Sequence, residues 1–105
     1  MKESDWKRFK ALRQLALERY CERVLLDIGC VGADAGKSQH ERYLDIYRLI
    51  HDRDEELGRA FNGLSRSKAV GQIALIRSLG LFSDEEFAGF SEELRSILGL
   101  YGSAE

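Results

Sequence analysis

The chain has 105 residues, of which 44% are hydrophobic and 32% are charged, a balance typical of one globular domain and unlike that of a disordered chain. Its formal net charge of −2 argues against binding nucleic acid or an anionic membrane through an overall positive field. Two cysteines, Cys21 and Cys30, form no metal motif and no disulfide framework, so we expect reduced thiols in a cytoplasmic protein. No stretch has the apolar character of a signal peptide or of a membrane span of about 18 residues.

The first predicted helix runs from about residue 5 to residue 28, with Ser4 as its expected cap. Its main apolar stripe consists of Trp6, Phe9, Leu17, Tyr20, Val24 and Ile28. Further apolar residues widen this stripe beyond the usual arc, and they are Leu12, Leu15, Ala16 and Leu26. So wide a face predicts contact with two or more neighbours. Arg13 lies inside the stripe as a charged exception.

Residues 29–37, with the sequence GCVGADAGK, are predicted to form a loop. Three glycines superficially suggest a phosphate-binding loop, but the P-loop spacing is missing and no strand precedes it. We therefore interpret the segment as a flexible connection between helices. Cys30 lies in it with Lys37 as the nearest potential activator, and no base stands at a defined spacing from the thiol.

The second predicted helix covers about residues 39–62. Ser38 and Glu41 form a capping box at its start, and Asn62 with Gly63 is a typical helix end. At about 100° per residue, one face collects six apolar or aromatic residues. They are Tyr43, Ile46, Tyr47, Ile50, Leu57 and Phe61. Asp54 falls near the middle of that face.

Two long helices joined by a short loop favour an antiparallel hairpin. Placing residue 28 opposite residue 39 brings Tyr20 level with Tyr47, and it also brings Arg13 level with Asp54. A lone buried charge is costly, whereas a paired guanidinium and carboxylate satisfy each other. We therefore predict that Arg13 and Asp54 form a buried structural ion pair that sets the register of the hairpin.

Two shorter helices are predicted at about residues 66–79 and 84–98. Gly80 ends the first of them, and a capping box of Ser83 and Glu86 begins the second. The predicted fold is thus an all-α, four-helix single domain over residues 1–105, with the two shorter helices packed on the hairpin. Residues 1–4 and 101–105 are expected to be frayed ends.

The preferred functional hypothesis is a small non-catalytic protein-interaction or regulatory domain. The apolar arc of the first helix exceeds what three neighbours can cover, and leftover apolar surface of this kind is typical of a binding site. The predicted interaction surface consists of Leu12, Leu15, Leu25 and Leu26. The expected partner is another protein or a second copy in a homodimer.

Two alternatives remain open. One is nucleic-acid binding through a basic patch that consists of Lys7, Arg8, Lys10, Arg66 and Lys68, although the net charge disfavours it. The other is a small-ligand-binding bundle centred on Arg13, Asp54 and the tyrosines, because Tyr20, Tyr43 and Tyr47 converge in the predicted register. We expect no metal or cofactor, since neither His40 nor His51 has an acidic residue three positions before it.

Overall fold

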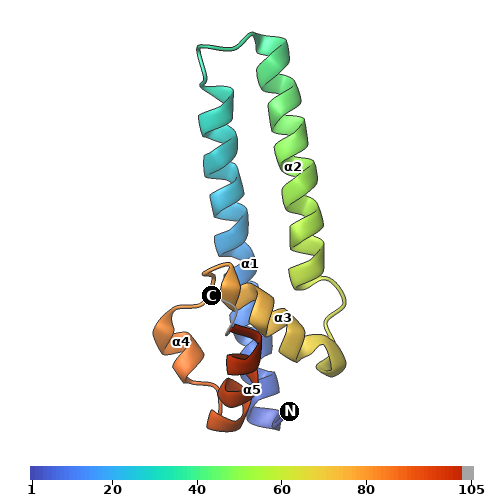
Figure 1. Cartoon of the computed structure of the whole chain (residues 1–105), viewed down its shortest axis with the longest axis vertical. Helices are drawn as coiled ribbons and strands as arrows, with labels where there is room; N and C mark the ends of the chain where they lie inside the picture. The colour runs from blue at the N-terminus through green and yellow to red at the C-terminus, as the bar shows by residue number, and fades with distance from the viewer. Residues whose placement is uncertain (103–105) are drawn as a thin grey trace.

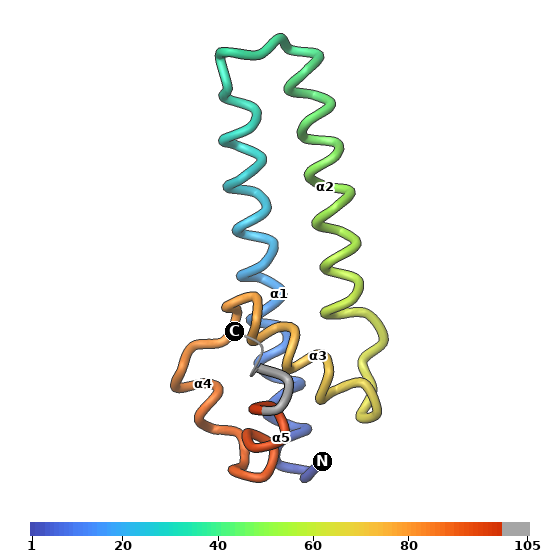
Figure 2. Tube along the Cα trace, in the orientation of Figure 1, coloured from blue at the N-terminus to red at the C-terminus, as the bar shows by residue number. Residues whose placement is uncertain are grey.

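The protein is an all-α chain in a computed structural model that describes the backbone of residues 1–102 and the side chains of residues 1–99 (Figure 1). Its five helices are α1 (Glu3–Gly32), α2 (Gln39–Phe61), α3 (Arg66–Ser78), α4 (Asp84–Ala88) and α5 (Glu92–Gly102). The predicted all-α fold is confirmed, and α1 and α2 pack side by side along the chain trace (Figure 2). Of the tail expected at 101–105, residues 103–105 lie outside the described part. In the part described, no helix is both long and apolar enough to cross a bilayer.

Local signals set most of the helix ends. Both capping boxes form: the Glu41 backbone N–H donates to Ser38 Oγ at 3.1 Å, and the Glu86 backbone N–H donates to Ser83 Oγ at 3.1 Å. Gly63 and Gly80 both have a φ of 71°, in the left-handed region that glycine adopts without steric cost. The predicted ends of α2 and α3 are therefore found where the sequence places them.

The predicted helix over residues 84–98 is interrupted. α4 ends at Ala88, and α5 begins at Glu92 with Ser91 before it, where Ser91 Oγ accepts the backbone N–H of Leu94 at 3.2 Å. Asp5 at the start of α1 accepts hydrogen bonds from Ser91 N at 2.8 Å and from Ser91 Oγ at 2.6 Å. This buried carboxylate holds the break between α4 and α5 against α1.

The hydrophobic core lies at one end of the molecule, where α3, α4 and α5 pack against the N-terminal half of α1 (Figure 1). Its largest fully buried side chains are Phe9, Phe61, Phe90, Ile73, Ile76, Leu81 and Leu98. The other half of the hairpin projects beyond this base, so the molecule measures 52 × 26 × 21 Å. Its radius of gyration is 16.5 Å, compared with about 13 Å for a compact domain of similar length.

The hairpin register differs from the predicted one. α1 continues through Gly29 to Gly32, so the connection is shorter than expected and α1 reaches further along α2. Arg42 donates to the Gly32 carbonyl at 2.9 Å and closes this extra turn. Tyr20 consequently lies opposite Arg53 and Glu56, where its hydroxyl is 2.9 Å from the Arg53 carbonyl and 2.8 Å from the Glu56 carboxylate.

The predicted ion pair between Arg13 and Asp54 is wrong. Arg13 Nη2 donates to the Phe61 backbone carbonyl at the end of α2, and its guanidinium lies 5.9 Å from the centre of the Phe61 ring. Asp54 is exposed. The last carbonyls of a helix lack partners within the helix and carry partial negative charge, so they bind a cation well. In the observed register Arg13 reaches this helix end.

Candidate functional site

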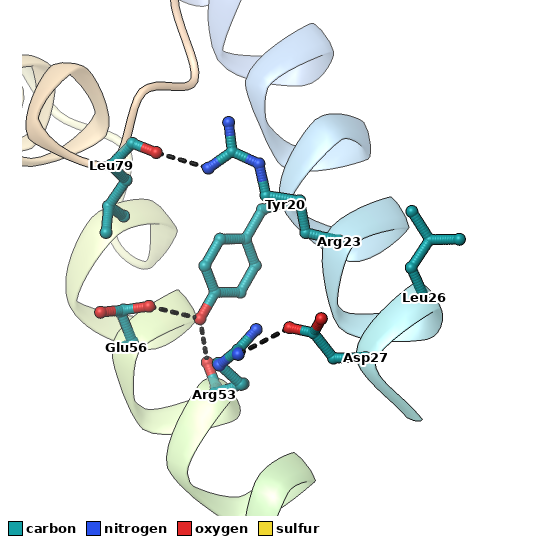
Figure 3. Close-up of a pocket in the computed structure, with 7 residues that line it drawn as sticks. All are labelled: Tyr20, Arg23, Leu26, Asp27, Arg53, Glu56 and Leu79. Carbon is teal, nitrogen blue, oxygen red and sulfur yellow. Dashed lines mark hydrogen bonds and ion pairs between the residues drawn. The ribbon is translucent and has the colours of Figure 1, made fainter. Parts of the chain in front are cut away.

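A cleft of about 410 Å³ lies at the base of the hairpin, where the end of α3 meets α1 and α2 (Figure 3). Its lining residues are Tyr20, Arg23, Leu26, Asp27, Arg53, Glu56 and Leu79. Arg53 pairs with Asp27 at 2.7 Å, and Tyr20 donates to Glu56. Arg23 donates to the carbonyls of Leu79 and Gly80. Each charged side chain in the cleft thus has a partner within the chain.

The chemistry of this cleft is structural. Burial, followed by the nearby carboxylate of Glu56, raises the pKa of Tyr20 far above its ordinary value, so the phenol stays protonated and remains a donor. The side chains that cross between α1 and α2 therefore lock the two helices in register. The charged side chains of the cleft therefore pair with other groups of the chain.

A second ion pair holds α4 against α1. Arg19 binds the Glu86 carboxylate through both terminal nitrogens, at 2.6 and 3.0 Å, and it also donates to the Leu81 carbonyl at 2.8 Å. The Arg19 guanidinium, followed by hydrogen bonds from Ser83, lowers the pKa of Glu86 to about 2, while burial opposes the shift. Sequence reasoning assigned Glu86 its capping role and missed Arg19, because nothing local connects residues so far apart in the chain.

The leucine surface is the first exposed apolar region of the hairpin, and we define it as Leu15, Leu25 and Leu26. All three were predicted to belong to the interaction surface, and Leu25 and Leu26 are 67% and 65% exposed. They line a shallow groove of about 510 Å³ on the outer side of α1, together with Glu18 and Glu22. Leu12, the fourth residue predicted for this surface, instead packs against the core.

The α2 stripe is the second exposed apolar region, and we define it as His40, Tyr43, Tyr47, Ile50 and His51. The sequence pattern predicted Tyr43, Tyr47 and Ile50 as core, and that prediction is wrong: Tyr43 and Tyr47 are 67% and 65% exposed. Ile46 packs on Gly32 of α1 instead. Helical spacing correctly grouped most of these residues on one face, but it could not say whether that face is covered.

The five residues of the predicted basic patch are partly engaged in contacts within the chain. Arg66 pairs with Glu3 and lies 5.4 Å from the centre of the Trp6 ring. Arg8 lies 6.0 Å from the Phe90 ring and donates to the Glu86 carbonyl at 3.4 Å. Lys7, Lys10 and Lys68 are exposed. Lys10 Nζ also lies 5.4 Å from the centre of the Trp6 ring. Three of the five cations therefore contact other groups of the chain, which weakens the case for binding phosphates.

The residues proposed for a ligand-binding bundle are not brought together. Tyr20 is buried in the cleft, whereas Tyr43 and Tyr47 face solvent and Asp54 lies apart from Arg13. Among the described residues, no cluster of three or more histidine, cysteine or acidic side chains is placed to hold a metal ion. Comparison of the chain with protein-family models, curated proteins and solved structures gives no match. The exposed hairpin is therefore the candidate site, on geometry alone.

Proposed function

We propose that the protein is a small, non-catalytic protein-interaction domain whose leucine surface binds an amphipathic helix of another protein. This proposal rests on the exposure of three leucines on one side of α1. These leucines lie in and beside the half of the hairpin that projects from the base. Large apolar side chains gathered on an exposed surface are typical of protein-binding sites. The base formed by α3, α4 and α5 holds the hairpin in place.

The chemistry of the partner follows from the rim of the groove. Glu18 and Glu22 lie between the leucines on the same face of α1, at about 100° per residue, and neither forms an ion pair with another described residue. A partner helix with leucine-like side chains at helical spacing and with lysine or arginine beside them would complement this rim. Electrostatic attraction of this kind mainly accelerates association and selects the partner, while the apolar contact supplies most of the affinity.

The expected affinity is moderate. Burying a leucine side chain completely contributes about 1.5–3 kcal/mol, and the three leucines are already partly covered. Scaled by their exposed fractions, the three leucines contribute about 3–5 kcal/mol. This contribution has to offset the loss of translational and rotational freedom on association, which costs about 4 kcal/mol or more. Contacts of the partner beside the leucines therefore have to supply the remaining affinity, and we expect a dissociation constant no tighter than the micromolar range, as for a regulatory contact that forms and breaks.

Site-specific photocrosslinking tests the proposal. A photoreactive residue at position 25 should capture a defined partner in the native cell, and the same residue at Ala88, exposed at the end of α4, serves as the control. The partner segment is then purified and its dissociation constant is measured by calorimetry. We expect Leu25→Ser with Leu26→Ser to weaken binding about tenfold or more, and Glu22→Lys to weaken it in a salt-dependent manner. Equal capture at both positions, or unchanged affinity of the leucine variant, would refute the proposal.

A further inference from the structure

We propose that a second copy of this chain docks on the α2 stripe, so that the projecting halves of two hairpins pack antiparallel around a two-fold axis beside Tyr47. This contact is separate from the leucine surface and does not depend on the partner helix proposed for it. It adds self-association to the activities of the chain, and it assigns a role to the most exposed aromatic side chains of the described residues.

The α2 stripe lies on the side of α2 that faces away from α3. Ile46 packs on Gly32 and marks the direction of α1. At about 100° per residue, Tyr43 and Tyr47 lie about 60° and 100° to one side of Ile46, whereas Glu56 lies about 80° to the other side. Glu56 faces the cleft that Leu79 closes. Because α3 packs on the Glu56 side, the stripe faces open solvent along its whole length.

The rings of the stripe are already ordered in the single chain. His40 stacks on Tyr43, with ring centres 6.5 Å apart and planes 23° apart. Tyr47 stacks on His51 at 6.5 Å with planes 10° apart, and His51 lies 3.4 Å from Glu55. Side chains that are ordered before association lose less conformational entropy when they bind. Tyrosine is also enriched in protein interfaces, because its ring is apolar and its hydroxyl can remain near water.

The order of residues along the stripe makes it complementary to itself. In an antiparallel pair centred on Tyr47, Tyr43 faces His51 of the second copy, and His40 faces Asp54 of the second copy. Asp54 and His40 form no ion pair with any other described residue, so both are available for this contact. A parallel pair would instead set Asp54 against Asp54. The antiparallel arrangement sets an imidazole N–H donor opposite a carboxylate at both ends of the interface, and this complementarity favours a second copy bound in an isologous contact.

The contact area is sufficient for a weak dimer. From His40 to Asp54 the stripe extends about 21 Å at about 1.5 Å per residue, and a hairpin two helices wide is about 20 Å across. Two such faces cover about 840 Å² in total, which is below the roughly 1,000 Å² of a stable interface and within the range of weak, transient contacts. We therefore expect a dimer that dissociates in the micromolar range or above, and whose population depends on protein concentration.

Sedimentation velocity of the full chain over a concentration series tests this inference. Tyr47→Ser should weaken dimerisation about tenfold or more. Leu25→Ser removes an equally exposed apolar side chain from the leucine surface and should leave the dimer unchanged. Both residues are exposed, so circular dichroism should show both variants folded. A chain that stays monomeric at all concentrations, or a dimer that Leu25→Ser disrupts and Tyr47→Ser does not, overturns the inference.

A charge exchange tests the antiparallel register. His40→Glu and Asp54→Lys should each weaken the dimer by about threefold to tenfold, because the first sets two carboxylates against each other and the second removes the acceptor of the imidazole N–H, at both ends of the interface. The variant that carries both substitutions sets a carboxylate at position 40 opposite a cation at position 54 of the second copy. Because these two groups attract each other, this double variant should restore dimerisation. Failure of this double variant to recover overturns the antiparallel arrangement. Photocrosslinking at position 25 is unaffected by these changes, so the two proposals fail independently.

Discussion

Replacement of Glu86 by glutamine should remove the ion pair that fastens α4 to α1 and make the protein less sensitive to acid. Glutamine keeps the size of the side chain and still serves as the third residue of a capping box, so the change isolates the charge. At neutral pH the variant loses the two charge-assisted hydrogen bonds from Arg19. The expected effect is a lower free energy of unfolding, without a change of fold.

The magnitude follows from the pKa. The shift of the Glu86 carboxyl from an ordinary value of 4.5 to about 2 corresponds to about 3 kcal/mol at about 1.4 kcal/mol per pH unit. The Glu86 side chain is 19% exposed and that of Arg19 is 37% exposed, so solvent screening reduces this to about 2 kcal/mol. Because the folded-state pKa is lowered, this stabilisation is present above about pH 4.5 and is lost as the pH falls to about 2.

Urea unfolding at a series of pH values between about 2 and 7 measures the effect. We expect the wild type to exceed Glu86→Gln by about 2 kcal/mol at pH 7 and the difference to vanish near pH 2. Glu85→Gln is the matched control, since Glu85 is an exposed neighbour in the same first turn of α4 and makes no ion pair among the described residues. If both variants follow parallel stability curves, the Arg19 contact contributes nothing measurable and the reasoning is refuted.

Three further substitutions test the contacts that hold the hairpin and the base. Tyr20→Phe removes the hydroxyl that joins α1 to α2. Thermal unfolding should show that the free energy of unfolding falls by about 1 kcal/mol. An unchanged unfolding midpoint would mean that water satisfies the hydroxyl equally well. Asp5→Asn removes the negative charge of the carboxylate that accepts two hydrogen bonds from Ser91. Urea unfolding should show that the free energy of unfolding falls by about 1.5–3 kcal/mol. A smaller decrease would contradict a role for the charge. Gly80→Ala places a side chain on a residue with a φ of 71°. Urea unfolding should show that the free energy of unfolding falls by about 1–2 kcal/mol. An unchanged free energy of unfolding would show that the turn relaxes to accommodate the side chain.

Much of the leucine surface could be predicted from the sequence, and the α2 stripe could not. The pattern of α1 contained more apolar residues than one neighbour could cover, and Leu15, Leu25 and Leu26 are indeed exposed. In α2 the same kind of pattern led to the opposite outcome, because Tyr43 and Tyr47 share a face that no other described helix covers. Periodicity identifies which residues lie together on a helix, and it contains no information about what packs against them.

The sequence by itself determined where α2 begins and ends, where α3 ends and where α4 begins. The capping residues Ser38 and Ser83 and the left-handed glycines Gly63 and Gly80 act within about four residues of the chain, so their effect is local and can be recognised in the sequence. Only the tertiary structure decided the register of the hairpin and the partner of Arg13. Glycine disfavours a helix by only about 1 kcal/mol per residue, so a tertiary contact of similar size, such as the hydrogen bond from Arg42 to the Gly32 carbonyl, can offset that cost. With α1 extended to Gly32, the contacts along the hairpin are shifted from the predicted register.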